Sequence, residues 1–180
     1  EQTLTYIIAE VGPNHNGSLE FALEYIEALS LIGVDAIKFQ LANPKLLFSK
    51  DSKLAKYQME NTKFKSPLEM IKKHQLKPSD HIKLYKRCKK KKIDYLCTGF
   101  DLESVKFLNE NFNLKYFKIA SGEIFSLDML EYMSNYNKPI ILSTGMAKFN
   151  EISETIKLLN SNFKKQITLL NNNEKLFNLI

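Results

Sequence analysis

The chain of 180 residues is long enough to bury the core of one medium-sized domain, and its composition, 44% hydrophobic and 26% charged, is that of a globular protein. The formal net charge is +6, and the two cysteines, Cys88 and Cys97, are too few for a disulfide framework. No apolar run reaches the ~18 residues of a membrane span, and no signal peptide is recognisable at the start. We therefore expect an intracellular, cytoplasmic protein with free, buried thiols.

The first elements follow the pattern strand, loop, helix, strand. An apolar strand beginning at Tyr6 places Glu10 near its end, and the loop from residue 12 to 17 leads into a helix with Ser18 as a plausible N-cap. Apolar residues recur at helical spacing from 19 to 32. In the second predicted strand, residues 34–40, side chains alternate, so Lys38 and Gln40 share the face opposite Ile37 and Phe39.

The remaining elements repeat this alternation after a long excursion over residues 41–80, which we expect to cover a functional site. Ser79 is predicted to cap a basic helix. Strands are predicted at 93–100, 139–145 and 166–170, and residues 114–123 are predicted to form a further strand and its exit loop. Helices are predicted at 101–111, 127–135 and from 150 or 151 onward. Helical crossovers imply parallel strands, so the fold class is α/β, either an open doubly wound sheet or a (β/α)₈ barrel. Residues 171–180 do not continue the pattern.

The basic run at residues 86–92 has two interpretations. Clustered lysine and arginine can bind nucleic acid. However, Ile82, Tyr85 and Cys88 recur at helical spacing beneath the charges, which is typical of the solvated face of a helix. We favour the helix face, and we predict no nucleic-acid partner and no membrane partner.

Polar side chains collect at the carboxyl ends of the predicted strands, where α/β proteins hold their chemistry. Lys38 and Lys118 are flanked by apolar residues that face the helices, so both lysines should face inward, and burying them is costly unless anions meet them. Glu10 could be one such partner, and a purely structural ion network remains an alternative. Lysines, hydroxyls and glycine-loop amides together favour a phosphate or carboxylate ligand. The candidate residues are Glu10, Lys38, Gln40, Thr98, Lys118, Ser121, Glu123 and Ser143.

The histidines indicate no metal site. His15, His74 and His81 are scattered along the sequence, and no spacing matches a ligand set. His15 lies among asparagines in the first loop, where a histidine often only stabilises a turn.

The same stretches carry a resemblance to a known family. The motifs are residues 8–17 (IAEVGPNHNG), 35–40 (DAIKFQ), 55–58 (AKYQ), 98–105 (TGFDLESV), 117–123 (FKIASGE) and 138–147 (KPIILSTGMA). In this order they resemble the N-acetylneuraminate (sialic acid) synthase family, including its legionaminate and other nonulosonate synthases. The resemblance covers about residues 6–170. It implies an incomplete TIM (β/α)₈-type barrel of about six strands over residues 1–170, followed by a divergent tail at 171–180.

The resemblance also implies a reaction. The family condenses phosphoenolpyruvate with an N-acylated hexosamine of the N-acetylmannosamine type and releases phosphate. Carried over motif by motif, phosphoenolpyruvate would be held by Lys38, Thr98, Lys118, Ser121 and Ser143. The catalytic candidates would be Glu10, as acid/base, and Glu123, while Gln40 and Tyr57 would contact the sugar.

The sequence departs from the family at its end. The family's sixth strand is followed by a His-Cys-Thr-like stretch, two metal-binding histidines and an antifreeze-like domain that caps a partner's site in a homodimer. None of these is recognisable in residues 171–180. The implied divalent metal, Mn or Mg, therefore has no histidine ligands in this chain, and we expect little or no activity from it alone.

Two other functions remain open. The chain could be a Schiff-base aldolase with Lys38 or Lys118 as nucleophile. It could also be a non-catalytic remnant that binds phosphorylated ligands.

Overall fold

The computed structural model describes residues 5–47, 72–145 and 147–170, and the chain divides into two compact units, residues 1–95 and 96–180. Hydrogen bonding links six strands in chain order, from β1 to β6. The pairs β1–β2, β3–β4, β4–β5 and β5–β6 are parallel. This repeated strand–helix arrangement confirms the α/β class predicted from the sequence. None of the helices in the described residues has the length and apolar character needed to span a bilayer.

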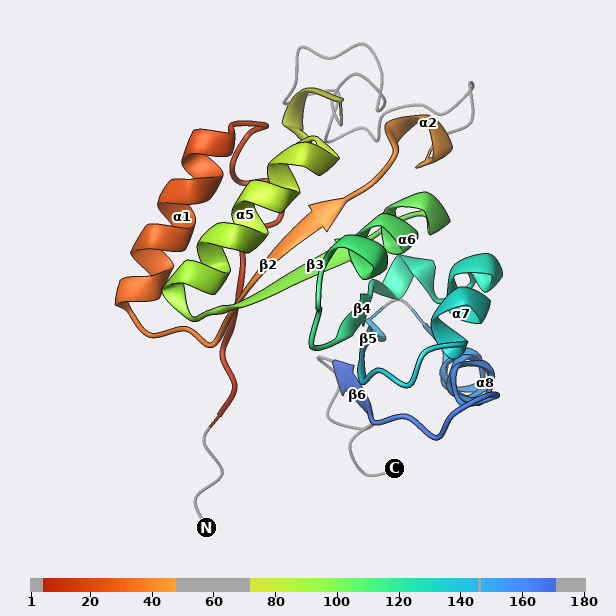
Figure 1. Ribbon diagram of the computed structural model, residues 1–180. Coiled ribbons are helices and arrows are strands. Elements are labelled where there is room, and N and C mark those ends of the chain that lie inside the picture. Colours follow the sequence, from red (N-terminus) through yellow and green to blue (C-terminus); the bar gives the residue numbers. More distant parts are fainter. Residues whose placement is uncertain (1–4, 48–71, 146, 171–180) are drawn as a thin grey trace. The chain divides into compact units, whose positions relative to one another are not determined.

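Unit 1 contains β1 (Ile8–Glu10), α1 (Leu19–Leu31), β2 (Ala36–Leu41), α2 (Pro44–Leu47) and α5 (Pro78–Lys91), and β3 (Asp94–Gly99) begins there. Ser18 is the N-cap of α1, as predicted, because its Oγ accepts a hydrogen bond from the Phe21 amide. Helices α1 and α5 pack side by side (Figure 1). Ile37 and Phe39 of β2 are fully buried, as the predicted alternation requires.

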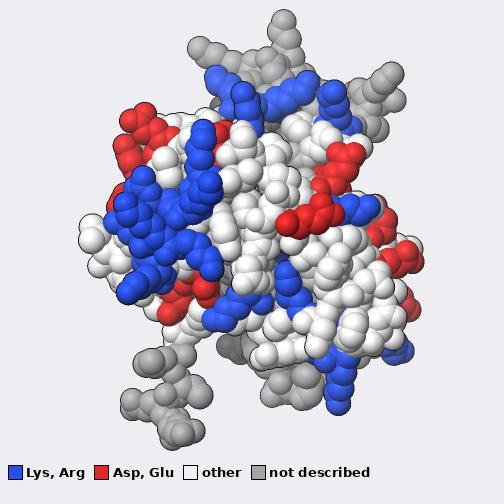
Figure 2. All heavy atoms as spheres, in the orientation of Figure 1, with Lys and Arg blue, Asp and Glu red and all other residues white. Residues whose placement is uncertain are grey.

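The basic helix α5 begins earlier than predicted. Lys77 is its N-cap and Pro78 its first helical residue, so the expectation that Ser79 caps this helix is wrong. Proline suits the first helical position because that position needs no amide donor. Figure 2 shows lysine and arginine side chains gathered in the region of α5.

The apolar side of α5 explains that basic surface. The prediction that Cys88 lies on the buried side is confirmed, but the other fully buried positions are His81 and Leu84, each one residue before the predicted Ile82 and Tyr85, which are only partly buried. Arg87 and Lys91 pair with Glu27 of α1. The basic run therefore forms the outer face of an amphipathic helix, the interpretation that the sequence favoured.

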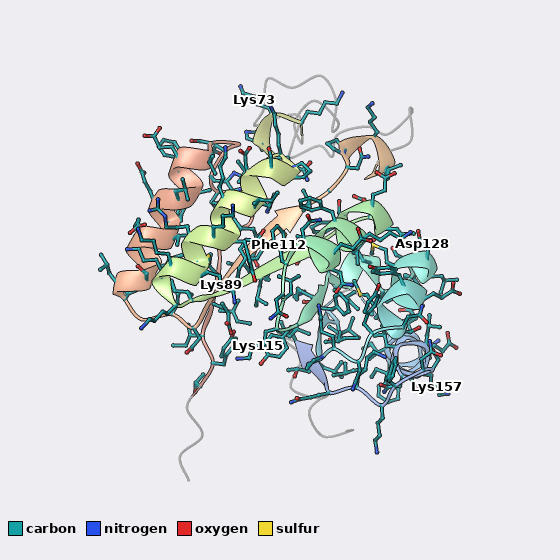
Figure 3. All side chains as sticks on the ribbon, in the orientation of Figure 1. Lys73, Lys89, Phe112, Lys115, Asp128 and Lys157 are labelled. Atoms are coloured by element: carbon teal, nitrogen blue, oxygen red, sulfur yellow. The ribbon has the colours of Figure 1, made fainter. Side chains whose placement is uncertain are left out.

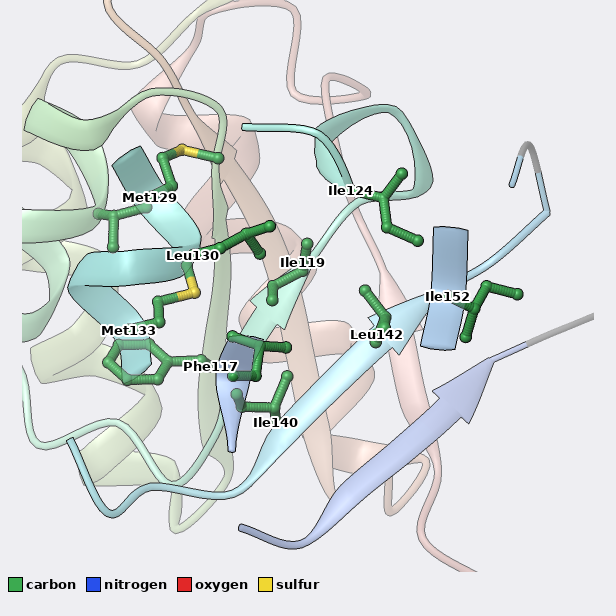
Figure 4. Close-up of a cluster of buried hydrophobic side chains, with 11 residues drawn as sticks. Phe117, Ile119, Ile124, Met129, Leu130, Met133, Ile140, Leu142 and Ile152 are labelled. Atoms are coloured by element: carbon green, nitrogen blue, oxygen red, sulfur yellow. The ribbon is translucent and has the colours of Figure 1, made fainter. Parts of the chain in front are cut away.

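Unit 2 continues with α6 (Leu102–Asn111), β4 (Phe117–Ile119), the 3₁₀ helix η1 (Ser121–Glu123), α7 (Leu127–Ser134), β5 (Ile140–Ser143), α8 (Phe149–Leu159) and β6 (Ile167–Leu170). Its core is a cluster of buried apolar side chains from the strands and the helices α7 and α8 (Figure 4). The buried Lys165 lies just before β6. It donates hydrogen bonds to the carbonyls of Ser134 and Leu159, the last residues of α7 and α8. One ammonium group therefore satisfies the ends of two helices.

Candidate functional site

In unit 1, the candidate site begins where β1 and β2 lie in register. Glu10 is the register partner of Lys38, and their side chains form an ion pair. The Lys38 side chain is 15% exposed and that of Glu10 is 44% exposed, so the carboxylate lies closer to solvent than the ammonium group. The predicted partnership of Glu10 with a rim lysine is confirmed for Lys38.

Gln40 lies near Glu10, and both side chains approach Gly12. A Cβ atom at Gly12 would lie 3.0 Å from Glu10 Oε1 and 3.2 Å from Gln40 Nε2, and its φ of +50° is one that glycine favours. The amides of Val11 and Gly12 both donate to the carbonyl of Lys38, so the first residues after β1 remain hydrogen-bonded to β2. The three predicted residues Glu10, Lys38 and Gln40 therefore lie around one glycine.

His15 supports the turn of this loop. Its ring is 2% exposed, its Nδ1 accepts a hydrogen bond from the Gly17 amide, and its centroid lies 6.4 Å from that of Phe39. Because Phe39 lies on the helix-facing side of β2, His15 packs behind the strand, away from Lys38. The turn-stabilising role suggested by the sequence is confirmed.

Although the three histidines are far apart in the sequence, the fold brings them close enough to interact electrostatically. Burial lowers the pKa of His15, and the charge of His74 lowers it further. Burial, with a smaller contribution from His15, lowers the pKa of His81 to about 4. His81 Nδ1 lies 2.6 Å from the Tyr95 hydroxyl, and the ring of Tyr95 stacks on that of Phe39. No local sequence pattern indicates this cluster, because the three histidines come from separate elements.

In unit 2, Lys118 is the centre of the candidate site. It is 5% exposed, and its Nζ donates hydrogen bonds to Ser143 Oγ at 2.8 Å and to the Ile119 carbonyl at 2.6 Å. Thr98 of β3 is the register partner of Lys118 and is 2% exposed. Side chains at register positions share a face of the sheet, so the structure brings together Thr98, Lys118 and Ser143.

The segment after β4 contributes two more predicted residues. Ser121 begins η1 and is partly buried. Glu123 ends η1, and its Oε2 accepts a hydrogen bond from Ser126 Oγ at 2.5 Å. Ser126 was not among the predicted residues, although its position three residues after Glu123 made this local contact possible. Tyr57, the other predicted sugar contact, lies outside the described residues.

The described residues do not fit the metal implied by the resemblance. Within residues 5–47, 72–145 and 147–170, no group of three or more histidine, cysteine, aspartate or glutamate side chains could hold a metal ion. What these residues can do without a metal is bind an anion at Lys118 and its hydroxyls, and transfer a proton at Glu10.

Comparisons with known proteins show which sequences and folds this chain resembles. The model of the NeuB family matches residues 25–175. An N,N'-diacetyllegionaminic acid synthase of Campylobacter jejuni is 46% identical over 169 residues, which are 92% of this chain and 50% of that protein. A Legionella pneumophila enzyme of the same name is 38% identical over 84% of this chain and 42% of its own length. The chain thus spans about half the length of the curated relatives that it matches.

A solved structure extends the likeness to the fold. The sialic acid synthetase of Leptospira borgpetersenii, crystallised in complex with citrate, superposes with a TM-score of 0.80 and 28% identity over 94% of this chain and 54% of that chain. The fold class is therefore that of an incomplete (β/α)₈ barrel, as the resemblance implied, and the open doubly wound sheet is excluded. With the family model and the relatives in agreement, this chain belongs to the NeuB family of sialic, legionaminic and pseudaminic acid synthases.

Proposed function

We propose that this chain binds phosphoenolpyruvate and supplies the acid/base residue for its condensation with an N-acylated hexosamine. The proposal is supported chiefly by Lys118, a lysine that is 5% exposed at the end of a parallel strand and is held by the hydroxyl of Ser143. The relatives include a legionaminic acid synthase and a sialic acid synthetase that was crystallised in complex with citrate, a polyanion. A buried ammonium group with hydroxyl neighbours suits the phosphate or carboxylate of such a substrate.

In the proposed mechanism, Lys118, Ser143, Thr98 and Ser121 hold the anionic groups of phosphoenolpyruvate, and Lys38 adds a second positive charge. The enol carbon forms a bond to the aldehyde carbon of the open-chain sugar, whose oxygen takes up a proton. Water then adds to the carbon that carries the phosphate ester, the C–O bond from this carbon to phosphate breaks, and the added hydroxyl loses its proton to give the keto group. Glu10, with its carboxylate held by Lys38, accepts the proton of the attacking water or delivers one to the aldehyde oxygen. Gln40 and Glu123 orient the sugar.

The full-length protein is expected to need a metal ion and a second subunit. We propose that the full-length protein is a cytoplasmic homodimer that uses Mn or Mg, and that Tyr57 contacts the sugar. Since no group in the described residues could hold the metal, no step of the mechanism is assigned to it here. We expect that the chain alone binds phosphoenolpyruvate and turns it over slowly or not at all.

The test is isothermal titration of the chain with phosphoenolpyruvate. Lys118→Met keeps most of the side-chain volume and removes the charge. We expect the affinity for phosphoenolpyruvate to fall by about tenfold or more, which corresponds to the loss of one hydrogen bond to a charged group. Lys115→Met is the matched control, since Lys115 is an exposed lysine just before the same strand (Figure 3). Failure of the chain to bind, or equal binding by both variants, would contradict the proposal.

A further inference from the structure

The hydroxyl of Ser126 departs from the usual role of a serine at the start of a helix. Ser126 is the N-cap of α7, but its side chain makes no capping hydrogen bond to the first amides of that helix. At the equivalent positions of α1 and α6, the side chains of Ser18 and Asp101 do accept such bonds from helix amides. A serine is favoured at an N-cap because it supplies this bond. In α7 the hydroxyl instead has a different partner.

That partner is the carboxylate of Glu123. Ser126 Oγ donates a hydrogen bond to Glu123 Oε2 at 2.5 Å, a length typical of a hydroxyl that meets an ionised carboxylate. Within the described part of the chain, Oε1 of the same carboxylate accepts no hydrogen bond. One oxygen is therefore fixed by the protein, and the other is left for a ligand.

The backbone that carries both residues is held by separate contacts. The Glu123 amide donates to the Ala120 carbonyl, and the Ser126 amide donates to the Glu123 carbonyl. Between them, Ile124 is 2% exposed and belongs to the apolar core of unit 2 (Figure 4). Its carbonyl accepts a hydrogen bond from Oγ1 of the buried Thr155 at 3.2 Å. What remains to be fixed is the Glu123 side chain, whose torsions lose entropy when they are ordered.

Glu123 lies at the end of the strand that carries Lys118. The helix η1 follows β4 after a single residue, so Ser121 and Glu123 lie beyond the carboxyl end of that parallel strand. Active sites of (β/α)₈ barrels lie at this end. Glu123 is only partly buried there, so a ligand can reach its carboxylate.

From these contacts we infer that Ser126 is a positioning residue for Glu123. Its hydroxyl fixes Oε2, so Oε1 keeps one orientation in which it accepts a hydrogen bond from a hydroxyl or the amide N–H of the sugar. Because the carboxylate is ordered before the sugar arrives, binding does not include the entropic cost of ordering it. The inference rests on the proposed role of Glu123 in orienting the sugar. It concerns the affinity for the sugar and not the affinity for phosphoenolpyruvate.

Three variants separate positioning from a general loss of stability. Ser126→Ala removes the hydroxyl, whereas Ser126→Thr keeps a hydroxyl at the same place and should behave as the parent does. Ser134→Ala is the matched control. It removes a serine hydroxyl at the other end of α7, where that hydroxyl donates to the Glu131 carbonyl at 2.8 Å. An effect that came only from weakening α7 would appear in both alanine variants.

The first measurement needs no ligand. The whole chain is labelled with ¹³C-glutamate, and the carboxyl carbon resonance of Glu123 is identified by its absence in Glu123→Gln. At pH 7 this resonance should shift in Ser126→Ala, because the carboxylate loses its donor, and should stay near the parent position in Ser126→Thr and Ser134→Ala. An unchanged resonance in Ser126→Ala, or equal shifts in both alanine variants, would overturn the inference.

The second measurement is isothermal titration of N-acetylmannosamine into the chain saturated with phosphoenolpyruvate. Ser126→Ala should lower the affinity for the sugar by about fivefold, which corresponds to one ordinary hydrogen bond, and Ser126→Thr should restore it. The affinity for phosphoenolpyruvate should be the same in all variants.

The outcomes distinguish this inference from the proposed function. If phosphoenolpyruvate binds, the inference is refuted by a parent chain that binds no sugar, by equal sugar affinities of the parent and Ser126→Ala, or by equal weakening in Ser134→Ala. If phosphoenolpyruvate does not bind, the proposed function fails, and the carboxyl resonance alone decides whether Ser126 holds Glu123.

Discussion

Lowering the pH from 7 to 5 should destabilise unit 1 through His81. This histidine is fully buried, and burial lowers its pKa from the ordinary value of 6.5 to about 4. The unfolded chain therefore binds a proton below pH 6.5 that the folded chain does not bind until about pH 4. Stability is complete above pH 6.5 and is lost as the pH falls from there toward 4.

The size of the effect follows from the two pKa values. Each pKa unit corresponds to about 1.4 kcal/mol, so the full loss between pH 7 and pH 4 is about 3 kcal/mol, of which about 2 kcal/mol is lost by pH 5. His15 contributes in the same direction, because burial lowers its pKa as well. The charge of Asp80 raises the pKa of His81, but this effect is smaller than that of burial.

Urea unfolding followed by far-ultraviolet circular dichroism at pH 7, 6 and 5 measures this loss. His81→Phe removes the titrating ring. Between pH 7 and pH 5 this variant should therefore lose about 2 kcal/mol less free energy of unfolding than the parent. Tyr95→Phe is the control: it removes the hydroxyl next to His81 but keeps the buried imidazole, so the pH dependence should remain. A His81 pKa near 6.5 in an NMR titration, or an unchanged pH dependence in His81→Phe, would refute the reasoning.

Three further predictions concern single positions. Gly17→Ala should destabilise the chain by more than Gly33→Ala. Both glycines have φ near +80°, a conformation that costs an alanine about 1–2 kcal/mol, but only at Gly17 would the added Cβ lie 2.2 Å from a carbonyl oxygen, that of Lys73. Equal melting temperatures of the two variants would contradict this prediction. Lys165→Met should cost about 2 kcal/mol in urea unfolding, because two helix-end carbonyls lose a charged donor, whereas the neighbouring exposed Lys164→Met should have no effect. Borohydride reduction in the presence of pyruvate should leave the chain mass unchanged, and an adduct at Lys38 or Lys118 would favour the Schiff-base aldolase.

Local sequence patterns predicted much of the fold and part of the site. The alternation around Phe39 placed Lys38 and Gln40 on the face opposite the helices, and the strand–loop–helix order placed Glu10 beside them. These predictions rest on the fixed period of a strand and on short connections, which neighbouring residues determine.

Other features depend on contacts between residues far apart in the chain. The interaction of His15 with His74 and His81 requires the loop, the helix α5 and the strands to be assembled first. Nothing beside Lys165 in the sequence indicates that its ammonium group reaches the carbonyl of Ser134. The cap of α5 was misplaced by two residues because Ser79 and Lys77 both precede favourable helical residues, and only the backbone geometry distinguishes them.

The distribution of tyrosines gives each unit its own optical signal. The chain has no tryptophan. In unit 1, Tyr95 stacks on Phe39 with 5.7 Å between the ring centroids, an asymmetric setting that should dominate the near-ultraviolet circular dichroism of that unit. In unit 2, Tyr132 packs at 5.1 Å from Tyr136, and burial raises the pKa of Tyr132 to about 12. Tyr132 should therefore form phenolate in folded unit 2 only well above the ordinary pKa of 10, which a spectrophotometric titration of the phenolate absorbance can follow.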